Sequence, residues 1–179
     1  MVWLFLFEGS LALLAIGLGW LFGIQPAADV QLSWQALAWG IAATLPLAAM
    51  LPVLARSSWP PLRRLISQID EVAVPLLSRL SLAELALLSM LAGLGEELLF
   101  RGLLQGGLAG KIGHGWALLA SSLIFGLCHA LTRTYAVLAT LIGLWLGGLW
   151  LLAGNLLAPM LTHALYDFFA LIYLLRWRR

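Results

Sequence analysis

The amino-acid sequence predicts an all-α fold, a polytopic membrane helix bundle of about six transmembrane helices. Of its 179 residues, 63% are hydrophobic and only 10% are charged. Soluble domains are nearer half apolar and a quarter charged, so a soluble core of this size could not absorb the excess. Apolar runs of roughly 17–25 residues, the length that crosses a bilayer, recur along the chain.

Charge and cysteine content exclude several other classes of protein. The net charge is +2, but the basic residues form no single patch in the sequence, so we expect no nucleic-acid partner. The single cysteine, Cys128, excludes an intramolecular disulfide and any CxxC site. We therefore expect the lipid bilayer, and a molecule embedded in it, to be the partners.

Residues 1–55 are predicted to form two N-terminal transmembrane helices, over residues 2–24 and 34–54. The first run lacks a basic start and is too long for the apolar part of a signal peptide, so we interpret it as a retained span. Residues 56–81 are predicted to be a cytoplasmic amphipathic linker, because apolar residues recur there at helical spacing between arginines and prolines.

Residues 82–179 are predicted to form a four-helix core, with spans near 82–108, 116–131, 135–152 and 156–175. The positive-inside rule then orients the chain with both termini in the cytoplasm. Lys111 is the only basic residue on the opposite side, apart from Arg101 within a span. The predicted location is a bacterial inner membrane. The basic residues on the cytoplasmic side are Arg56, Arg63, Arg64, Arg79, Arg133, Arg176, Arg178 and Arg179.

Three ionisable residues lie together in the third predicted span: Glu96, Glu97 and Arg101. A charged side chain at this depth is costly, so these groups must be paired, used in chemistry, or both. Adjacent glutamates point about 100° apart on a helix, whereas Arg101 follows Glu97 by one turn. We expect Glu97 and Arg101 to form an internal ion pair and Glu96 to face a cavity. A pair that only locks helices together is the structural alternative.

Two histidines can join this cluster. Glu96 and His129 are equidistant from the expected turn at 112–113, so they should lie at the same depth in neighbouring helices. His163 and Asp167 share a helix face, but His163 should lie roughly 12 Å from its turn, against roughly 24 Å for the other pair. Alone, either histidine is more often a structural hydrogen-bonded residue. Gly93 and Gly95 are placed for close packing of neighbouring helices.

Such a cluster is suited to peptide hydrolysis. Glu96 can act as a general base on water, and His129 can orient that water or pass a proton to the leaving amine. The pair of His163 and Asp167 can donate hydrogen bonds to an oxyanion. The same residues, Glu96, His129 and His163, could instead bind a divalent metal such as zinc. The sequence therefore predicts no cofactor with certainty.

Three motifs now carry a family resemblance: Glu96-Glu97-x-x-x-Arg101, then Phe125-x-x-x-His129, then His163-x-x-x-Asp167. They resemble the motif set of the CPBP family, the CAAX prenyl protease type II and Abi proteins, over residues 82–175. The resemblance implies an intramembrane endopeptidase, of glutamic or metalloprotease type. It implies water activation by Glu96 and His129, oxyanion stabilisation by His163 with position 167, and supporting roles for Glu97 and Arg101.

One departure concerns Asp167, where asparagine is common in that family. An ionised aspartate cannot donate a hydrogen bond, so Asp167 is also a candidate for orienting His163. The expected substrate is a membrane-associated protein or peptide, cleaved during C-terminal sorting, anchor processing or peptide maturation, rather than a prenylated CAAX protein. The alternatives are a non-catalytic membrane scaffold or immunity protein, and a small proton-coupled transporter that relays protons through Glu96 and His129.

Overall fold

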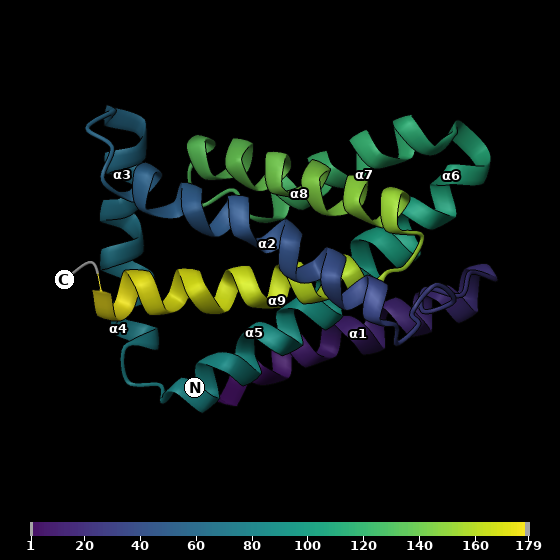
Figure 1. Ribbon diagram of the computed structural model, residues 1–179, viewed down its shortest axis with the longest axis horizontal. Helices are drawn as coiled ribbons and strands as arrows, with labels where there is room; N and C mark the ends of the chain where they lie inside the picture. The colour runs from purple at the N-terminus through teal and green to yellow at the C-terminus, as the bar shows by residue number, and fades with distance from the viewer. Residues whose placement is uncertain (1, 178–179) are drawn as a thin grey trace.

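The computed structural model describes residues 2–177, and within that range the chain folds into helices with no strand, as predicted. Figure 1 shows α2, α8 and α9 along the long axis, with α3 across one end. In chain order the elements are α1 (Val2–Phe22), α2 (Trp34–Ala55), α3 (Pro60–Gln68), the π-helical η1 (Ile69–Ala73), α4 (Val74–Leu77), α5 (Leu82–Glu97), the π-helical η2 (Leu98–Gln105), α6 (Gly106–Ile112), α7 (His114–Cys128), α8 (Arg133–Ala153), α9 (Leu157–Ile172) and the π-helical η3 (Tyr173–Trp177).

Short polar residues set the starts of the main helices. The Ser33 hydroxyl accepts a hydrogen bond from the Ala36 amide at the start of α2, and Thr132 does the same for Tyr135 at the start of α8. Ser81 and Glu84 form a reciprocal capping box at the start of α5. These caps satisfy backbone amides that a helix start leaves free. The boundaries of the helices that carry the cluster are therefore encoded locally.

Four helices are long and apolar enough to cross a membrane within residues 2–177, or five if the bent pair Pro60–Leu77 and Leu82–Ile112 counts as one span. The helical membrane bundle is thus confirmed. The length and hydropathy of the individual helices support four or five spans, where the sequence predicted about six. Leu82–Ile112 carries the charged cluster, which lowers its hydropathy. The fourth predicted span is α7, whose 15 residues reach only about 22 Å, less than the roughly 30 Å of a hydrocarbon core.

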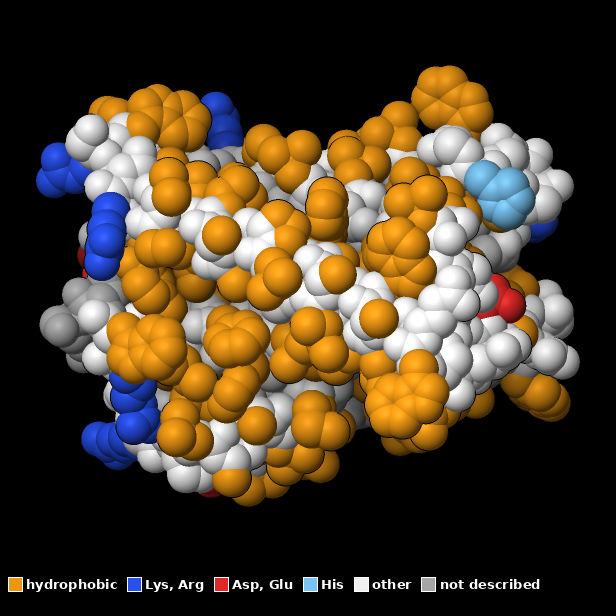
Figure 2. Space-filling view, viewed as in Figure 1, with side chains coloured by type: hydrophobic (Ala, Val, Ile, Leu, Met, Phe, Trp, Pro, Cys, Tyr) orange, Lys and Arg blue, Asp and Glu red, His pale blue; other side chains and the backbone are white. Residues whose placement is uncertain are grey.

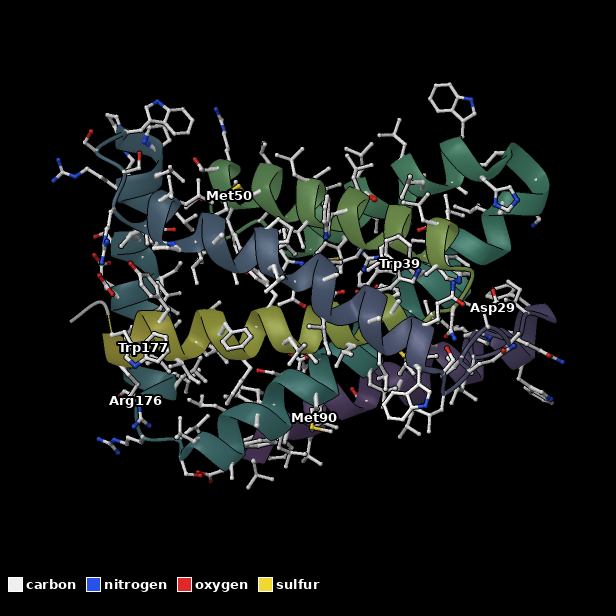
Figure 3. All side chains as sticks on the ribbon, in the orientation of Figure 1. Asp29, Trp39, Met50, Met90, Arg176 and Trp177 are labelled. Atoms are coloured by element: carbon white, nitrogen blue, oxygen red, sulfur yellow. The ribbon has the colours of Figure 1, made fainter. Side chains whose placement is uncertain are left out.

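The segment between the N-terminal helices and α5 is amphipathic. Leu62 and Leu65 of α3 are buried, while Arg63 and Arg64 are exposed. Figure 2 shows that the basic side chains on the visible face gather mainly at this end, and hydrophobic side chains cover most of the rest. In Figure 3, Arg176 lies at the same end and Asp29 at the opposite one. Of the arginines used for the predicted orientation, Arg178 and Arg179 lie outside the described residues.

Helices distant in sequence pack together around α5 and α9. These pairs are α2 with α9, α5 with α9, and α1 with α5, while the consecutive helices α7 and α8 pack on each other. The N-terminal helices therefore complete the bundle rather than standing apart from it. This arrangement places α5, which carries Glu96 and Glu97, between α1 and α9.

Candidate active site

Glycines allow the helices that carry the cluster to approach closely. A Cβ atom at Gly93 would lie 2.8 Å from the carbonyl oxygen of Met160 and 2.9 Å from the amide nitrogen of Ala164, both on α9. A Cβ atom at Gly95 would lie 2.6 Å from the carbonyl oxygen of Glu8 on α1. A larger residue at either position would push the helices apart. The predicted close packing at Gly93 and Gly95 is confirmed.

Glu97 and Arg101 form the expected internal ion pair, with 2.8 Å between Glu97 Oε1 and an Arg101 guanidinium nitrogen and both side chains fully buried. Arg101 also donates to the Gly143 carbonyl on α8, at 3.1 Å. The same Glu97 oxygen accepts a hydrogen bond from His163 Nδ1 at 2.8 Å. Glu97 thus joins α5 to α9 and fixes the ring of His163, a contact that the sequence did not indicate.

Glu96 points away from this pair and meets His129. Glu96 Oε2 lies 3.6 Å from His129 Nε2. His129 Nδ1 lies 2.8 Å from the carbonyl oxygen of Phe125. Because a carbonyl oxygen only accepts, Nδ1 carries the hydrogen, and a neutral His129 presents the lone pair of Nε2 to Glu96. A carboxylate and an imidazole lone pair can both accept from one water molecule placed beside them.

His163 faces two carboxylates, one at each ring nitrogen. Its Nδ1 donates to Glu97, and its Nε2 lies 3.5 Å from Asp167 Oδ2. The expected difference in depth does not keep His163 from the cluster. Figure 1 shows why, because the α6–α7 elbow extends further from the bundle than the α8–α9 turn. Glu96 and His129 are further along their helices from the α6–α7 turn than His163 is from the α8–α9 turn. Because the α6–α7 turn also lies further out, the three residues reach the same depth.

The structure does not arrange the three predicted metal ligands, Glu96, His129 and His163, as a metal site. Within residues 2–177 no group of three or more His, Cys, Asp or Glu side chains is arranged to hold a metal ion. His163 Nδ1 donates to Glu97 and Nε2 lies 3.5 Å from Asp167 Oδ2, so both ring nitrogens are directed at carboxylates other than Glu96. The donor geometry does not fit a zinc site made by these three residues, and we derive no step through a metal.

Phe125 is the aromatic centre of the cluster. Its ring stacks on His129 with 4.4 Å between centroids, and the Arg101 guanidinium carbon lies 4.5 Å from its centroid. The ring also presents an edge-to-face contact to His163. A single buried side chain therefore positions both histidines and the arginine, and it accounts for the Phe125-x-x-x-His129 spacing.

A cavity of about 600 Å³ opens beside these residues. Glu96, His129, His163 and Asp167 all line it, whereas the fully buried Glu97 and Arg101 do not. Apolar side chains from several elements, with the largest shares from α2 and α8, form most of the remaining wall. The six predicted residues are thus divided between a cavity-facing group of four and a buried pair behind them.

The cavity wall includes three titratable residues that the sequence interpretation did not select: Glu8, Tyr135 and Tyr166. Tyr135 contacts the ring of His129 edge-to-face, with 5.9 Å between centroids. Glu8 carries the one signal that sequence reasoning could have used, since a carboxylate inside an apolar span is a functional candidate by default. The two tyrosines had no comparable signal, because tyrosine is common near helix ends in membranes.

Comparison with known proteins adds one finding. A family model described as Type II CAAX prenyl endopeptidase Rce1-like matches residues 78–169. The matched region begins just before α5 and ends within α9, so it includes all six predicted site residues. No significant match was found among curated proteins or among solved structures.

Proposed function

Because the chain belongs to the family described as Type II CAAX prenyl endopeptidase Rce1-like, and is thus an intramembrane protease, we propose that Glu96 and His129 activate the water that cleaves its substrate. The observation that carries this proposal is their pairing, with 3.6 Å between Glu96 Oε2 and His129 Nε2 at the wall of the cavity. Two acceptors directed at one position can hold a water and take its proton.

In the proposed reaction Glu96 accepts a proton from water, and the resulting hydroxide attacks the carbonyl carbon of the scissile peptide bond. His129 orients the water, takes the proton from Glu96 at its free Nε2, and passes it to the leaving amine, which leaves both groups ready for the next cycle. His163 donates from Nδ1 to Glu97, and the Nε2–H of a protonated ring, which faces the cavity beside Asp167, would stabilise the oxyanion. Glu97 and Arg101 position His163 from behind, and Asp167 orients its outer edge.

The proposed substrate is a membrane-associated protein or peptide cleaved close to its membrane attachment. The cavity supports this, because its wall is largely apolar and includes Glu96, His129, His163 and Asp167. An apolar chain would lie against the apolar wall while a peptide carbonyl reaches the polar groups. Removal of a C-terminal sorting segment or maturation of a peptide would both meet these requirements.

The test is cleavage of quenched fluorogenic peptides with an apolar segment by protein in proteoliposomes. Glu96→Gln keeps the shape of the side chain but removes the base, and His129→Ala removes its partner. General acid–base groups contribute about 10²–10⁴-fold, so each variant should lose at least about 10²-fold in kcat. Glu71→Gln, an exposed carboxylate on η1, is the matched control and should cleave normally.

Cleavage at the wild-type rate by Glu96→Gln and His129→Ala would contradict the proposal. A chelator added to the wild-type reaction gives a separate comparison. Since the three predicted metal ligands are not arranged around a common point, we expect cleavage to continue in its presence. Loss of cleavage that zinc restores would favour the metalloprotease alternative.

A further inference from the structure

Glu8 is an acidic residue within the apolar helix α1, outside the region that the family model matches. It is partly buried and lines the cavity together with Glu96 and Asp167. An ionisable side chain in such a helix is expensive to place in a membrane. The proposed reaction makes no use of it, so its position requires another explanation.

The backbone of α1 is held against the active-site helix at this residue. The close approach at Gly95 puts the Glu8 carbonyl oxygen where a Cβ atom on α5 would otherwise lie. From this position Glu8 lines the same cavity as His163 and Asp167 of α9. The backbone contact with Gly95 therefore holds Glu8 in the cavity wall.

The cavity has an excess of acidic groups. Glu8, Glu96 and Asp167 line it, and no lysine or arginine is among its described lining residues. Arg101 lies behind the wall and is committed to Glu97. His163 lies between Glu97 and Asp167, so a positive charge on its ring is already shared by two carboxylates. The cavity thus offers more negative than positive partners to whatever enters it.

Two carboxylate oxygens facing this space lack a hydrogen-bond partner in the described structure: Glu8 Oε2 and Glu96 Oε2. Glu96 is only 8% exposed, so its oxygen is unpartnered although almost entirely buried. Buried carboxylates normally have donors, because leaving them unpaired is costly. A group that enters the cavity and carries several N–H donors and a positive charge would satisfy this requirement.

We propose that Glu8, together with Asp167, forms a subsite that accepts a primary ammonium group of the substrate next to the scissile bond, which makes Glu8 a specificity-determining residue. The ammonium can belong to a lysine side chain or to a free amino terminus. The subsite rests on the proposed function for its biological meaning, but binding can be measured without any cleavage.

The experiment measures the dissociation constants of apolar peptides for the detergent-solubilised protein. One peptide series carries a single lysine at each of several successive positions, and a matched series carries norleucine, which has the same stem without the ammonium. A third series has a free or an acetylated amino terminus, which separates the two sources of the charge. The proteins are the wild type, Glu8→Gln, Glu8→Asp and Glu71→Gln.

At one position, we expect wild-type protein to bind the lysine peptide about tenfold more tightly than the norleucine peptide, or else to bind the free amino terminus about tenfold more tightly than the acetylated one. The ratio of the two dissociation constants is the quantity compared between variants. In Glu8→Gln this ratio should fall to near one, and in Glu8→Asp part of it should remain. Glu71→Gln should keep the full ratio, because its carboxylate lies outside the cavity. Thermal unfolding of each variant shows whether a lost ratio instead reflects a lost fold.

Equal binding of charged and uncharged peptides by the wild type at every position would overturn the subsite, as would an unchanged ratio in folded Glu8→Gln. Cleavage distinguishes this failure from failure of the proposed function. If peptides are cleaved without any preference for the ammonium, the protease proposal stands and the subsite is wrong. If the preference exists but no peptide is cleaved, the subsite stands and the water-activation proposal is wrong.

Discussion

The two adjacent glutamates of α5 differ in every contact they make. Glu97 is fully buried and its Oε1 accepts from Arg101 and His163, whereas Glu96 lines the cavity and lies 3.6 Å from His129 Nε2. One residue therefore holds three helices together through Arg101, Gly143 and His163, and the other is free to meet a substrate. The difference follows from the angle of about 100° between neighbouring side chains on a helix.

Replacing Glu97 should therefore cost more stability than replacing Glu96. Glu97→Gln leaves the Arg101 charge buried without its partner, which costs about 3–5 kcal/mol, while Glu96→Gln breaks no ion pair. Equilibrium unfolding in mixed detergent micelles measures both values. The double variant Glu97→Gln/Arg101→Met should recover part of the loss, because it removes both charges. Equal stability of the two single variants would contradict this assignment.

The ring of His129 is held by the backbone rather than by another side chain. Its Nδ1 donates to the Phe125 carbonyl, an acceptor that remains whatever residue occupies position 125. The sequence could therefore indicate the pair of Glu96 and His129 from spacing, but not what fixes the ring. Glu97 was likewise assigned to Arg101 alone, because the spacing of four residues reveals a partner one turn away and conceals His163, 66 residues away.

At the scale of elements, the approach of α5 to α9 controls the site. Gly93→Val should destabilise the protein by about 1–3 kcal/mol, because its side chain would press on the backbone at Met160 and Ala164. It should also reduce cleavage by moving Glu97 away from His163. Thermal unfolding and fluorogenic cleavage measure the two effects. Gly148→Ala on α8 is the control: a Cβ atom there meets nothing within 4 Å, so cleavage should stay unchanged and the protein should be no less stable.

Helix positions were predictable here because hydrophobic runs and polar caps are local signals. The four long apolar helices match runs of the sequence. The short α7 was overestimated, since apolar residues continue through Leu127 and Leu131 while the helix ends at Cys128. The π-helical η2, which contains Arg101, had no signal either, because the switch from α to π geometry follows from packing between helices.

At the scale of the whole molecule, the end that carries the arginines of α3 and η3 is predicted to face the cytoplasm. In a Cys128→Ser background, Arg64→Cys on α3 should be protected from an impermeant maleimide in intact cells and labelled after permeabilisation. Lys111→Cys at the opposite end should be labelled in intact cells. The expectation follows from the positive-inside rule, with arginines gathered around α3 and η3. The reverse pattern would place the termini outside the cytoplasm.

The volume of the cavity limits how a membrane segment can be cut. One turn of α-helix, with a pitch of 5.4 Å and a diameter of 10–12 Å, occupies roughly 400–600 Å³. A cavity of about 600 Å³ therefore admits about one helical turn beside the polar groups. A transmembrane helix is several times longer, so it cannot be enclosed whole. Such a substrate must enter by one end or unwind locally, and its cut should fall within about a turn of where its helix stops.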